Sequence, residues 1–240
     1  MSGMLWAAIA LSAIIGYGIG SIQWGIIVSR LTRGVDVRDY GSGATGTTNV
    51  IRTSGAKAGV AVMLLDIAKG VAPVYIGIGL GHLFGVDAKD DRAWAAATGA
   101  FAAVVGHCWP AFYGFRGGKA VASGFGAALA MNPLAAVAMV PVAALIVGAT
   151  RIMSVMSIAM PPIVAAFFFV LAAMDISPWA WAAYAIPTAV LIAYRHQANI
   201  GRLLAGTEPK IGKGGEKRTN VESVAREGPG ERTLTEQHHQ

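Results

Sequence analysis

Long runs of apolar residues alternate with shorter polar stretches along most of this chain. A helix needs about 20 apolar residues to cross the roughly 30 Å of hydrocarbon in a bilayer. Runs with no charge, or almost none, occupy residues 4–29, 58–86, 93–110, 120–150, 152–174 and 176–194. This pattern predicts an all-α integral membrane protein.

The fourth run is too long for a single span. As one helix, residues 120–150 would reach about 46 Å at roughly 1.5 Å per residue. Pro133 lies near the middle of the run, and a proline there kinks or divides a helix. Division at this proline gives seven transmembrane helices, with the N-terminus outside and the C-terminus in the cytoplasm.

The distribution of charge favours seven spans. The chain carries 19 Lys and Arg residues against 13 Asp and Glu residues. With seven spans most basic residues lie on the cytoplasmic side, whereas without the division everything after residue 150 would change sides and most would lie outside. The polar connections then all face the cytoplasm, at 30–57, 106–119, 150–157 and 195–209. An enzyme with cytoplasmic substrates would show this arrangement.

The two ends of the chain differ in character. Residues 1–29 contain no charged side chain, so they lack the basic segment of a signal peptide and predict a retained span. Residues 210–240 are polar, which predicts a disordered cytoplasmic tail beside a transmembrane domain at 1–209. Because a basic excess is usual on the cytoplasmic side, we expect contact with membrane lipids and no nucleic-acid partner.

Cysteine usage excludes two kinds of chemistry. Cys108 is the single cysteine, so no intramolecular disulfide can form. No CxxC motif or Cys/His cluster offers a zinc site. We therefore expect no metal and no other cofactor.

The stretch GSGATGTTNVIR, residues 41–52, is an unusual loop to find beside a membrane span. Gly41, Gly43 and Gly46 permit positive φ angles, which turn successive N–H groups toward one point and form an anion site. Hydroxyl, amide and cationic groups accompany them: Ser42, Thr45, Thr47, Thr48, Asn49 and Arg52. The combination predicts a phosphate site, and a tight loop that needs glycine for its turns is the alternative.

A second glycine-rich segment, GHCWPAFYGFRGGKA at 106–120, ends just before a span. Gly117, Gly118 and Lys119 there predict another anion site at a helix N-terminus, with cytoplasmic anchoring of the lysine as the alternative. A nucleotide-binding GxxxxGK[ST] loop would need glycine and a hydroxyl where Tyr113 and Ala120 stand, so ATP hydrolysis is not indicated.

The third polar segment, RHQANIGRLLAGTE at 195–208, directly follows the last span. His196, Asn199 and Arg202 recur every three residues, so they share one broad face of a continued helix. A histidine in this position is a candidate general base near neutral pH. An ordinary histidine at the membrane interface is the alternative.

Polar side chains also occur within and beside the apolar runs. Asp66 and Lys69 are spaced i, i+3 inside the second run, where charges are costly and commonly pair or face a cavity. They form either a structural pair or part of a site through Lys69. Ser154 and Ser157 lie at the start of a span, where helix capping is the first explanation and a site role the second.

Taken together, five segments resemble the bacterial acyl-phosphate:glycerol-3-phosphate acyltransferases, the PlsY family. The family patterns are GSGNxGATNxxR, LDxxKG, GHxxPxFxxFxGGKxVA, RxxSxxS and RHxxNxxRLxxGxE. This chain has GSGATGTTNVIR, LDIAKG, GHCWPAFYGFRGGKAVA, RIMSVMS and RHQANIGRLLAGTE in the same order. The resemblance implies a seven-helix enzyme of the bacterial cytoplasmic (inner) membrane, with a cytoplasmic active site and no nucleotide or metal. Its reaction would move an acyl chain from acyl phosphate to glycerol 3-phosphate, giving lysophosphatidic acid.

Carried over residue by residue, the resemblance implies a catalytic set of Ser42, Arg52, Lys119, His196 and Asn199. It implies substrate contacts from Gly41, Gly43, Gly46, Thr48, Asn49, Lys69, Gly117, Gly118, Ser154, Ser157, Arg202 and Glu208, with Glu208 holding its own segment in place. The proton of the attacking hydroxyl could pass to His196 or to a substrate phosphate oxygen, and the sequence does not choose between them.

The chain also departs from the family pattern. Ala44 stands in place of Asn, Thr47 in place of Ala, and GSIQWG at 20–25 in place of a GSIPFG-like segment. The same anion sites would serve a transporter or channel for a phosphorylated anion, or a non-catalytic protein that binds lipid headgroups. These alternatives remain beside the acyltransferase interpretation.

One further match is interpreted as coincidental. HLFGVD has the HxxxxD spacing of soluble glycerolipid acyltransferases, in which the His and Asp form a catalytic dyad. His82 and Asp87 fall here at the outer end of the second span. The basic loops are predicted on the opposite side of the membrane.

Overall fold

The computed structural model describes residues 3–211, 213 and 215–217, and it is helical apart from the connections. The helices are α1 Gly3–Gly20, α2 Trp24–Arg33, α3 Thr47–Ser54, α4 Ala56–Leu83, α5 Lys89–Cys108, α6 Val121–Met131, α7 Pro133–Thr150, α8 Met153–Ala173, α9 Trp179–Arg195 and α10 Gln197–Leu204. Two 3-10 helices, η1 Val37–Asp39 and η2 Ala111–Tyr113, lie in the connections. The predicted all-α class is confirmed. The predicted disorder of the tail falls largely outside the described residues.

The helices differ in whether they can cross a bilayer. Within the described residues, five stretches are long and apolar enough by length and composition: Gly3–Arg33, Ala56–Leu83, Lys89–Tyr113, Pro133–Thr150 and Met153–Ala173. α9 is slightly shorter at 17 residues, and α6 has only 11. At roughly 1.5 Å per residue α6 reaches about 16 Å, so it falls short of the hydrocarbon thickness.

The first apolar run, in which one span was predicted, is long and apolar enough to cross a bilayer but consists of two helices. α1 ends at Gly20, and α2 begins at Trp24. The Lys69 ammonium of α4 donates to the carbonyl oxygens of Gly20 at 3.3 Å and Ile22 at 2.7 Å. The end of a helix leaves carbonyl groups without hydrogen-bond donors. The buried ammonium of Lys69 is the donor here.

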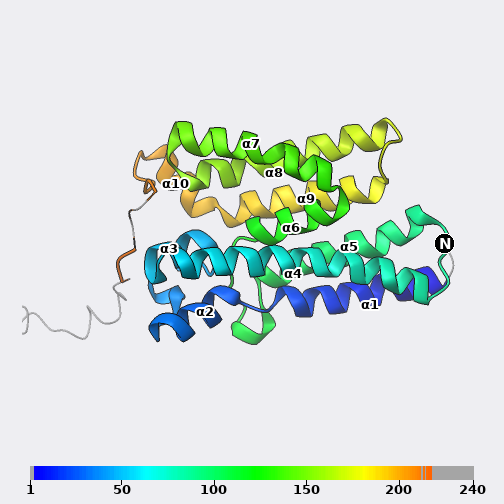
Figure 1. The fold of residues 1–240 in the computed structure, drawn as a ribbon, viewed down its shortest axis with the longest axis horizontal. Coiled ribbons are helices and arrows are strands. Elements are labelled where there is room, and N and C mark those ends of the chain that lie inside the picture. The colour runs from blue at the N-terminus through cyan, green and yellow to red at the C-terminus, as the bar shows by residue number, and fades with distance from the viewer. Residues whose placement is uncertain (1–2, 212, 214, 218–240) are drawn as a thin grey trace, which may run out of the picture.

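The fourth run divides where the proline predicts. α6 ends at Met131, and the Asn132 side chain accepts a hydrogen bond from the Ala135 N–H at 3.0 Å. Pro133 takes the first position of α7, where its missing N–H costs nothing. α7 then runs back toward the end of the bundle at which α10 lies (Figure 1).

Small residues let the helices pack closely. A Cβ added to Gly16 of α1 would lie 2.1 Å from the Gly99 carbonyl oxygen of α5, and one added to Gly126 of α6 would lie 2.1 Å from the Ile67 carbonyl oxygen of α4. Such close backbone contact stabilises helix pairs in membranes by van der Waals packing. Pairs of glycine-containing faces therefore fix α5 against α1 and α6 against α4.

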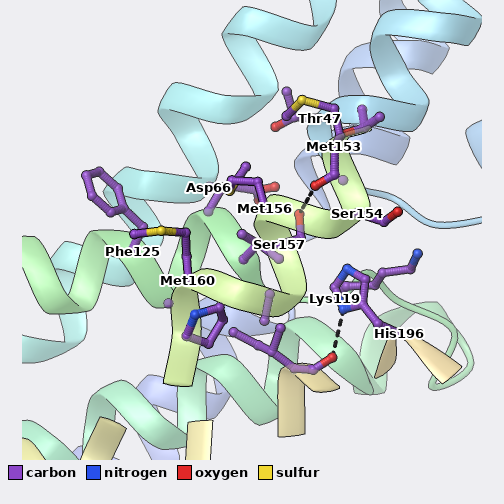
Figure 2. A pocket seen from close by; sticks show the side chains of 18 of the residues that line it. Thr47, Asp66, Lys119, Phe125, Met153, Ser154, Met156, Ser157, Met160 and His196 are labelled. Atoms are coloured by element: carbon purple, nitrogen blue, oxygen red, sulfur yellow. Dashed lines mark hydrogen bonds between the residues drawn. The ribbon is translucent and has the colours of Figure 1, made fainter. Parts of the chain in front are cut away.

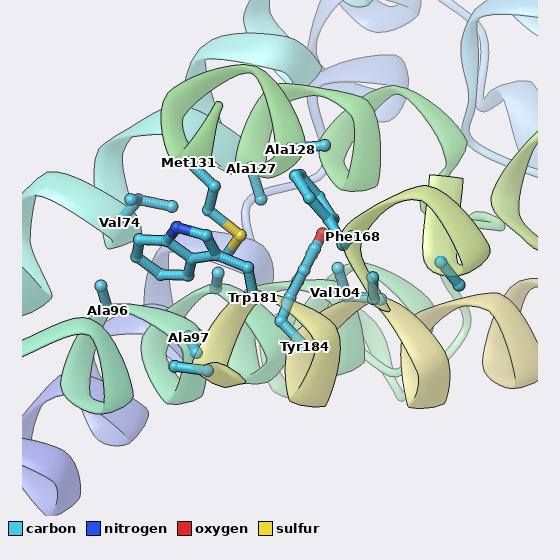
Figure 3. Close-up of a cluster of buried hydrophobic side chains, with 14 of the residues drawn as sticks. Val74, Ala96, Ala97, Val104, Ala127, Ala128, Met131, Phe168, Trp181 and Tyr184 are labelled. Carbon is cyan, nitrogen blue, oxygen red and sulfur yellow. The ribbon is translucent and has the colours of Figure 1, made fainter. Parts of the chain in front are cut away.

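Larger side chains fill the space between the two groups of helices. Phe168 of α8 and Tyr184 of α9 are almost fully buried, and Trp181 lies beside them. Figure 3 shows these rings directed toward Ala128 and Met131 of α6. The core thus joins the late helices to the short helix α6.

The polar connections gather at one end of the bundle. α2, α3 and α10 lie together there, and the beginning of α1 lies at the opposite end (Figure 1). Because α6 and α7 run in opposite directions, the junction between α7 and α8 is also returned to this end. The three polar segments singled out in the sequence therefore meet in space.

Candidate active site

Two cavities meet where the polar segments converge. The larger has a volume of about 490 Å³ and lies among α3, α4 and α6–α9. The smaller, of about 310 Å³, lies between the two glycine-rich loops and the segment after α9. Both are lined by Ser42, Ala44, Lys119 and Asn199. A ligand in one cavity can therefore touch a ligand in the other.

The larger cavity has a polar mouth and an apolar body. Lys119, His196 and Ser154 lie at one end, and Phe125 and Met160 lie farther along (Figure 2). His196 and Tyr184 both line it, and they are about 18 Å apart along α9 at roughly 1.5 Å per residue. Five methionines contribute to the wall, which suits a flexible apolar guest: Met63, Met139, Met153, Met156 and Met160.

The side chain of Asn49 holds the first loop together. Its amide nitrogen donates to the carbonyl oxygens of Val37, Tyr40 and Ala44 at 2.9 to 3.0 Å. Its amide oxygen accepts from the Ser42 N–H at 3.1 Å. Asn49, which the sequence predicted as a substrate contact, also lines the larger cavity. The side-chain hydrogen bonds of Asn49 therefore fix the shape of the loop.

The glycines of this loop form turns without forming an open anion nest. Gly41 and Gly43 have φ angles of 50° and 70°, whereas Gly46 has a φ of −84° and precedes α3. The N–H groups of residues 41–44 bond to acceptors in the chain itself: Glu216 O, Asn49 Oδ1, Tyr40 O and Ser42 Oγ. The predicted nest of free N–H groups is therefore wrong. Side chains and the first turn of α3 are left to bind an anion.

Arg195 fixes the second loop. Its Nε donates to the Gly118 carbonyl oxygen at 3.2 Å and its Nη2 to that of Gly117 at 3.4 Å. The guanidinium carbon lies 5.4 Å from the centre of the Trp109 ring, which is a cation–π contact. Arg195 was not predicted as a site residue, although it begins the third segment. Its role depends on two distant segments meeting.

A chain of hydrogen bonds connects the second loop to the third segment. The Lys119 ammonium donates to Asn199 Oδ1, and Asn199 Nδ2 donates to Glu208 Oε1 at 2.6 Å. Arg202 Nε donates to the other oxygen of Glu208 at 2.7 Å. Burial raises the pKa of Glu208, but hydrogen bonds, the largest from Asn199, and the charge of Arg202 together outweigh burial and lower the pKa. Glu208 thus holds this segment as an anion.

His196 presents one free ring nitrogen. Its Nδ1 lies 2.7 Å from the Ile192 carbonyl oxygen (Figure 2), and because a carbonyl only accepts, this nitrogen carries the proton. Nε2 is then a bare acceptor. Burial, followed by the charge of Lys119, lowers the pKa of His196 to about 4. The ring is therefore neutral at physiological pH.

The cations at the mouth are also affected by burial. Burial and the charge of Arg202 lower the pKa of Lys119 to about 8. Burial likewise lowers the pKa of Arg52, which lines the larger cavity and donates to the Pro209 carbonyl oxygen at 3.4 Å. The anchoring alternative for Lys119 does not fit a side chain enclosed by both cavities.

Hydroxyl groups complete the mouth of the larger cavity. The buried Thr47 Oγ1 has no hydrogen-bond partner among the described residues, which leaves it for a ligand. Ser154 and Ser157 line the same cavity, and Ser157 Oγ donates to the Met153 carbonyl oxygen at 2.9 Å. The N-terminal cap of α8 is Ile152, so neither serine is its cap.

The remaining predicted residues occupy different places. Gly46 and Thr48 line the larger cavity, while Gly43, Gly117 and Arg202 line the smaller one. In the described part of the chain, three predicted contacts line neither cavity: Gly41, Lys69 and Gly118. Lys69 Nζ instead lies 3.1 Å from Asp66 Oδ1, as expected for a structural pair. His82 lies in the last turn of α4, at the opposite end of the bundle from α10 (Figure 1).

Clustered cations at the mouth of a long apolar cavity, within a bundle of apolar helices, are characteristic of a membrane enzyme that acts on phosphorylated lipids or their precursors. Comparison with known proteins identifies the family within this class. The family model described as glycerol-3-phosphate acyltransferase matches residues 10–206. The chain belongs to this family, so it is an integral membrane acyltransferase of phospholipid synthesis.

Individual relatives agree with the family. A glycerol-3-phosphate acyltransferase of Rippkaea orientalis is 40% identical over 88% of this chain and 96% of its own length. One from Anaeromyxobacter dehalogenans is 43% identical over 88% of this chain and all of its own length. These relatives decide against the transporter and the non-catalytic alternatives.

Two solved structures share the fold. Both are crystal structures of PlsY (YgiH), an integral membrane glycerol 3-phosphate acyltransferase. The glycerol 3-phosphate form has a TM-score of 0.74 at 37% identity and covers 86% of this chain and 96% of its own. The lysophosphatidic acid form has a TM-score of 0.72 at 36% identity and covers 85% and 95%.

Proposed function

We propose that this enzyme transfers a fatty acyl group from acyl phosphate to the 1-hydroxyl of glycerol 3-phosphate, giving lysophosphatidic acid and inorganic phosphate. The observation that carries the proposal is the pair of cavities, one long and apolar and one small and polar, that share Lys119 and Asn199. Acyl phosphate has an apolar chain and a phosphate that must be held apart from it. The larger, apolar cavity suits the acyl chain of this donor, and the smaller, polar cavity suits its phosphate.

The chemical structure of the product indicates which cavity each substrate occupies. Lysophosphatidic acid joins the acyl chain to glycerol phosphate, so the chain and the acceptor belong in one cavity. We assign the chain to the apolar body of the larger cavity and the acceptor to its mouth, beside Arg52 and Thr47. The departing phosphate then occupies the smaller cavity, which Lys119, Arg195 and Arg202 line with positive charge.

The reaction requires no covalent enzyme intermediate. The acceptor oxygen attacks the acyl carbon, the bond from that carbon to the phosphate oxygen breaks, and its electron pair leaves with the phosphate. Lys119 lies at the junction, where its charge stabilises the negative charge that develops on the leaving group. Asn199 keeps the ammonium in position through its Oδ1.

We assign the proton of the acceptor hydroxyl to the departing phosphate. The departing inorganic phosphate is at least as basic as a phosphate monoester, whose second pKa is about 6, whereas the pKa of His196 is about 4. The phosphate is therefore the stronger base near neutral pH. His196 Nε2 accepts a hydrogen bond from the other hydroxyl of glycerol 3-phosphate, and this bond orients the attacking oxygen toward the acyl carbon.

The membrane arrangement is part of the proposal. We place the chain in the bacterial cytoplasmic membrane with seven membrane helices in a domain at 1–209, α6 being a short one, with the N-terminus outside and the site on the cytoplasmic side. The gathering of α2, α3 and α10 at one end (Figure 1) supports a single catalytic face. The positive-inside rule supports the cytoplasm as its location.

The test is turnover by the purified protein with labelled glycerol 3-phosphate and acyl phosphate. We expect equal amounts of lysophosphatidic acid and inorganic phosphate. Arg52→Ala should raise the KM for glycerol 3-phosphate roughly tenfold or more, because an interaction with a charged group of the acceptor is lost. Arg33→Ala, which removes an exposed cation from α2, is the matched control and should leave this KM unchanged. Absence of turnover would reject the function, and an unchanged KM in Arg52→Ala would reject the assignment of the acceptor.

A further inference from the structure

The break between α1 and α2 brings a polar side chain into the protein interior. Gln23 lies at this break and is completely buried, with an exposed fraction of 0%. Lys69 holds the break by its hydrogen bonds to the Gly20 and Ile22 carbonyl oxygens. A buried carboxamide is costly unless its donors and acceptors are used. The partners of Gln23 therefore indicate its role.

Gln23 connects the first loop to the end of α5. Its Oε1 accepts from Thr45 Oγ1 at 2.6 Å, and its Nε2 donates to the His107 carbonyl oxygen at 3.3 Å. Thr45 and His107 are 1% and 2% exposed. Hydrogen bonds in such a water-free environment are strong and keep a fixed geometry.

The same carbonyl oxygen of His107 also holds the second loop. It accepts from the Gly118 N–H at 3.0 Å. A Cβ added to Gly118 would lie 2.1 Å from His107 Nε2 and 3.0 Å from Thr45 Oγ1. The hydroxyl of the first loop thus lies close to the backbone of the second loop. Gln23 bonds to this hydroxyl directly and to the carbonyl oxygen that holds Gly118.

We propose that Gln23 is a positioning residue which, through Thr45 and the His107 carbonyl, sets the distance between the two loops that enclose the leaving phosphate. This inference rests on the function proposed above. Ser42 and Gly117, which both line the smaller cavity, belong to the two loops that Gln23 joins. Position 23 lies in the GSIQWG segment that departs from the GSIPFG-like pattern, and a proline there has no carboxamide. The connection is a feature of this chain.

The test uses variants that remove one hydrogen-bonding group each. Gln23→Leu removes the carboxamide, Thr45→Val removes the hydroxyl with little change in shape, and Thr45→Ser keeps the hydroxyl. Ser12→Ala is the matched control, because it deletes an equally buried hydrogen bond, from Ser12 Oγ to the Ala95 carbonyl oxygen at 2.7 Å, between α1 and α5. Initial rates at varied acyl phosphate and the melting temperature are measured for each.

We expect kcat/KM for acyl phosphate to fall roughly tenfold to a hundredfold in Gln23→Leu and in Thr45→Val, since a small displacement at a reacting centre has effects of this size. Thr45→Ser should stay near the wild type, and the Gln23→Leu/Thr45→Val double variant should be no worse than the poorer single variant. Ser12→Ala should change the melting temperature alone. If Gln23→Leu does not fold, the two Thr45 variants decide.

The inference is overturned if Thr45→Val keeps the wild-type kcat/KM, or if its loss is no greater than that of Ser12→Ala. Additive effects in the double variant would also contradict it, because they would show that Gln23 and Thr45 act separately. The wild type is assayed in the same experiment. If the wild type itself fails to turn over acyl phosphate, the proposed function has failed instead.

Discussion

At the scale of single residues, burial decides how the titratable groups of the site behave. Lys119 and His196 are both enclosed at the mouth of the larger cavity, and burial favours the neutral form of each. Sequence spacing predicted both residues because each lies in a short polar segment beside a span. It did not predict the role of Arg195, whose bond to Gly118 joins residues 77 positions apart, nor that the loop N–H groups are already engaged.

Lys119 should give the enzyme an alkaline limit. Its pKa is about 8, so the ammonium loses its charge as the pH rises through that value. The pH profile of kcat/KM reports groups of the free enzyme, and we expect it to fall above about pH 8. Lys119→Arg keeps its charge throughout this range, so its slower reaction should lack the alkaline fall. A fall at the same pH in this variant would assign it to another group.

His196→Gln tests which group takes the proton. If the phosphate is the acceptor, the acidic limb of the rate profile near about pH 6 belongs to the substrate and should persist in the variant. The loss in kcat should be about tenfold, below the hundredfold or more expected for a missing general base. Loss of the acidic limb together with a larger fall in kcat would make His196 the base.

At the scale of helices, close backbone contacts position α6 and the loop before it. Apolar runs and Pro133 were enough to predict most helices, because both signals are local. The break at Gln23 and the separate helices α2 and α3 were not predicted. These features depend on contacts with distant groups, such as the Lys69 ammonium, that leave no periodic signal in the sequence.

Gly126→Ala should separate α4 from α6. The new Cβ would lie 2.1 Å from the Ile67 carbonyl oxygen, and overpacking of this kind costs about 1–3 kcal/mol. We expect a lower melting temperature in detergent and reduced turnover. Gly79→Ala is the control, since nothing lies within 4 Å of its Cβ, and a helical alanine is more stable than glycine. Equal melting temperatures for the two variants would contradict the close contact.

At the scale of the whole molecule, the candidate active site lies at the end of the bundle with α10, and the acidic turn at the start of α5 lies at the opposite end (Figure 1). The distribution of basic residues predicts that the end with the site faces the cytoplasm, whereas the short length of α6 was not predicted. In a Cys108→Ser background, Ala205→Cys at the end of α10 and Lys89→Cys at the start of α5 place exposed thiols at the two ends. We expect an impermeant reagent added to intact cells to label Lys89→Cys and to leave Ala205→Cys unlabelled. Labelling of Ala205→Cys alone would show that the orientation in the membrane is opposite to the proposed one.

The choice of donor is the most direct test of the proposed chemistry. On the proposed function, the smaller cavity lined by Lys119, Arg195 and Arg202 stabilises a departing phosphate and offers nothing specific to a thiolate. One purified preparation should be given labelled glycerol 3-phosphate with either acyl phosphate or acyl-CoA, and His82→Ala should be assayed in parallel. We predict labelled lysophosphatidic acid with acyl phosphate, almost none with acyl-CoA, and full activity in His82→Ala. Comparable rates with acyl-CoA, or a folded but inactive His82→Ala variant, would contradict the proposed donor and the site that binds it.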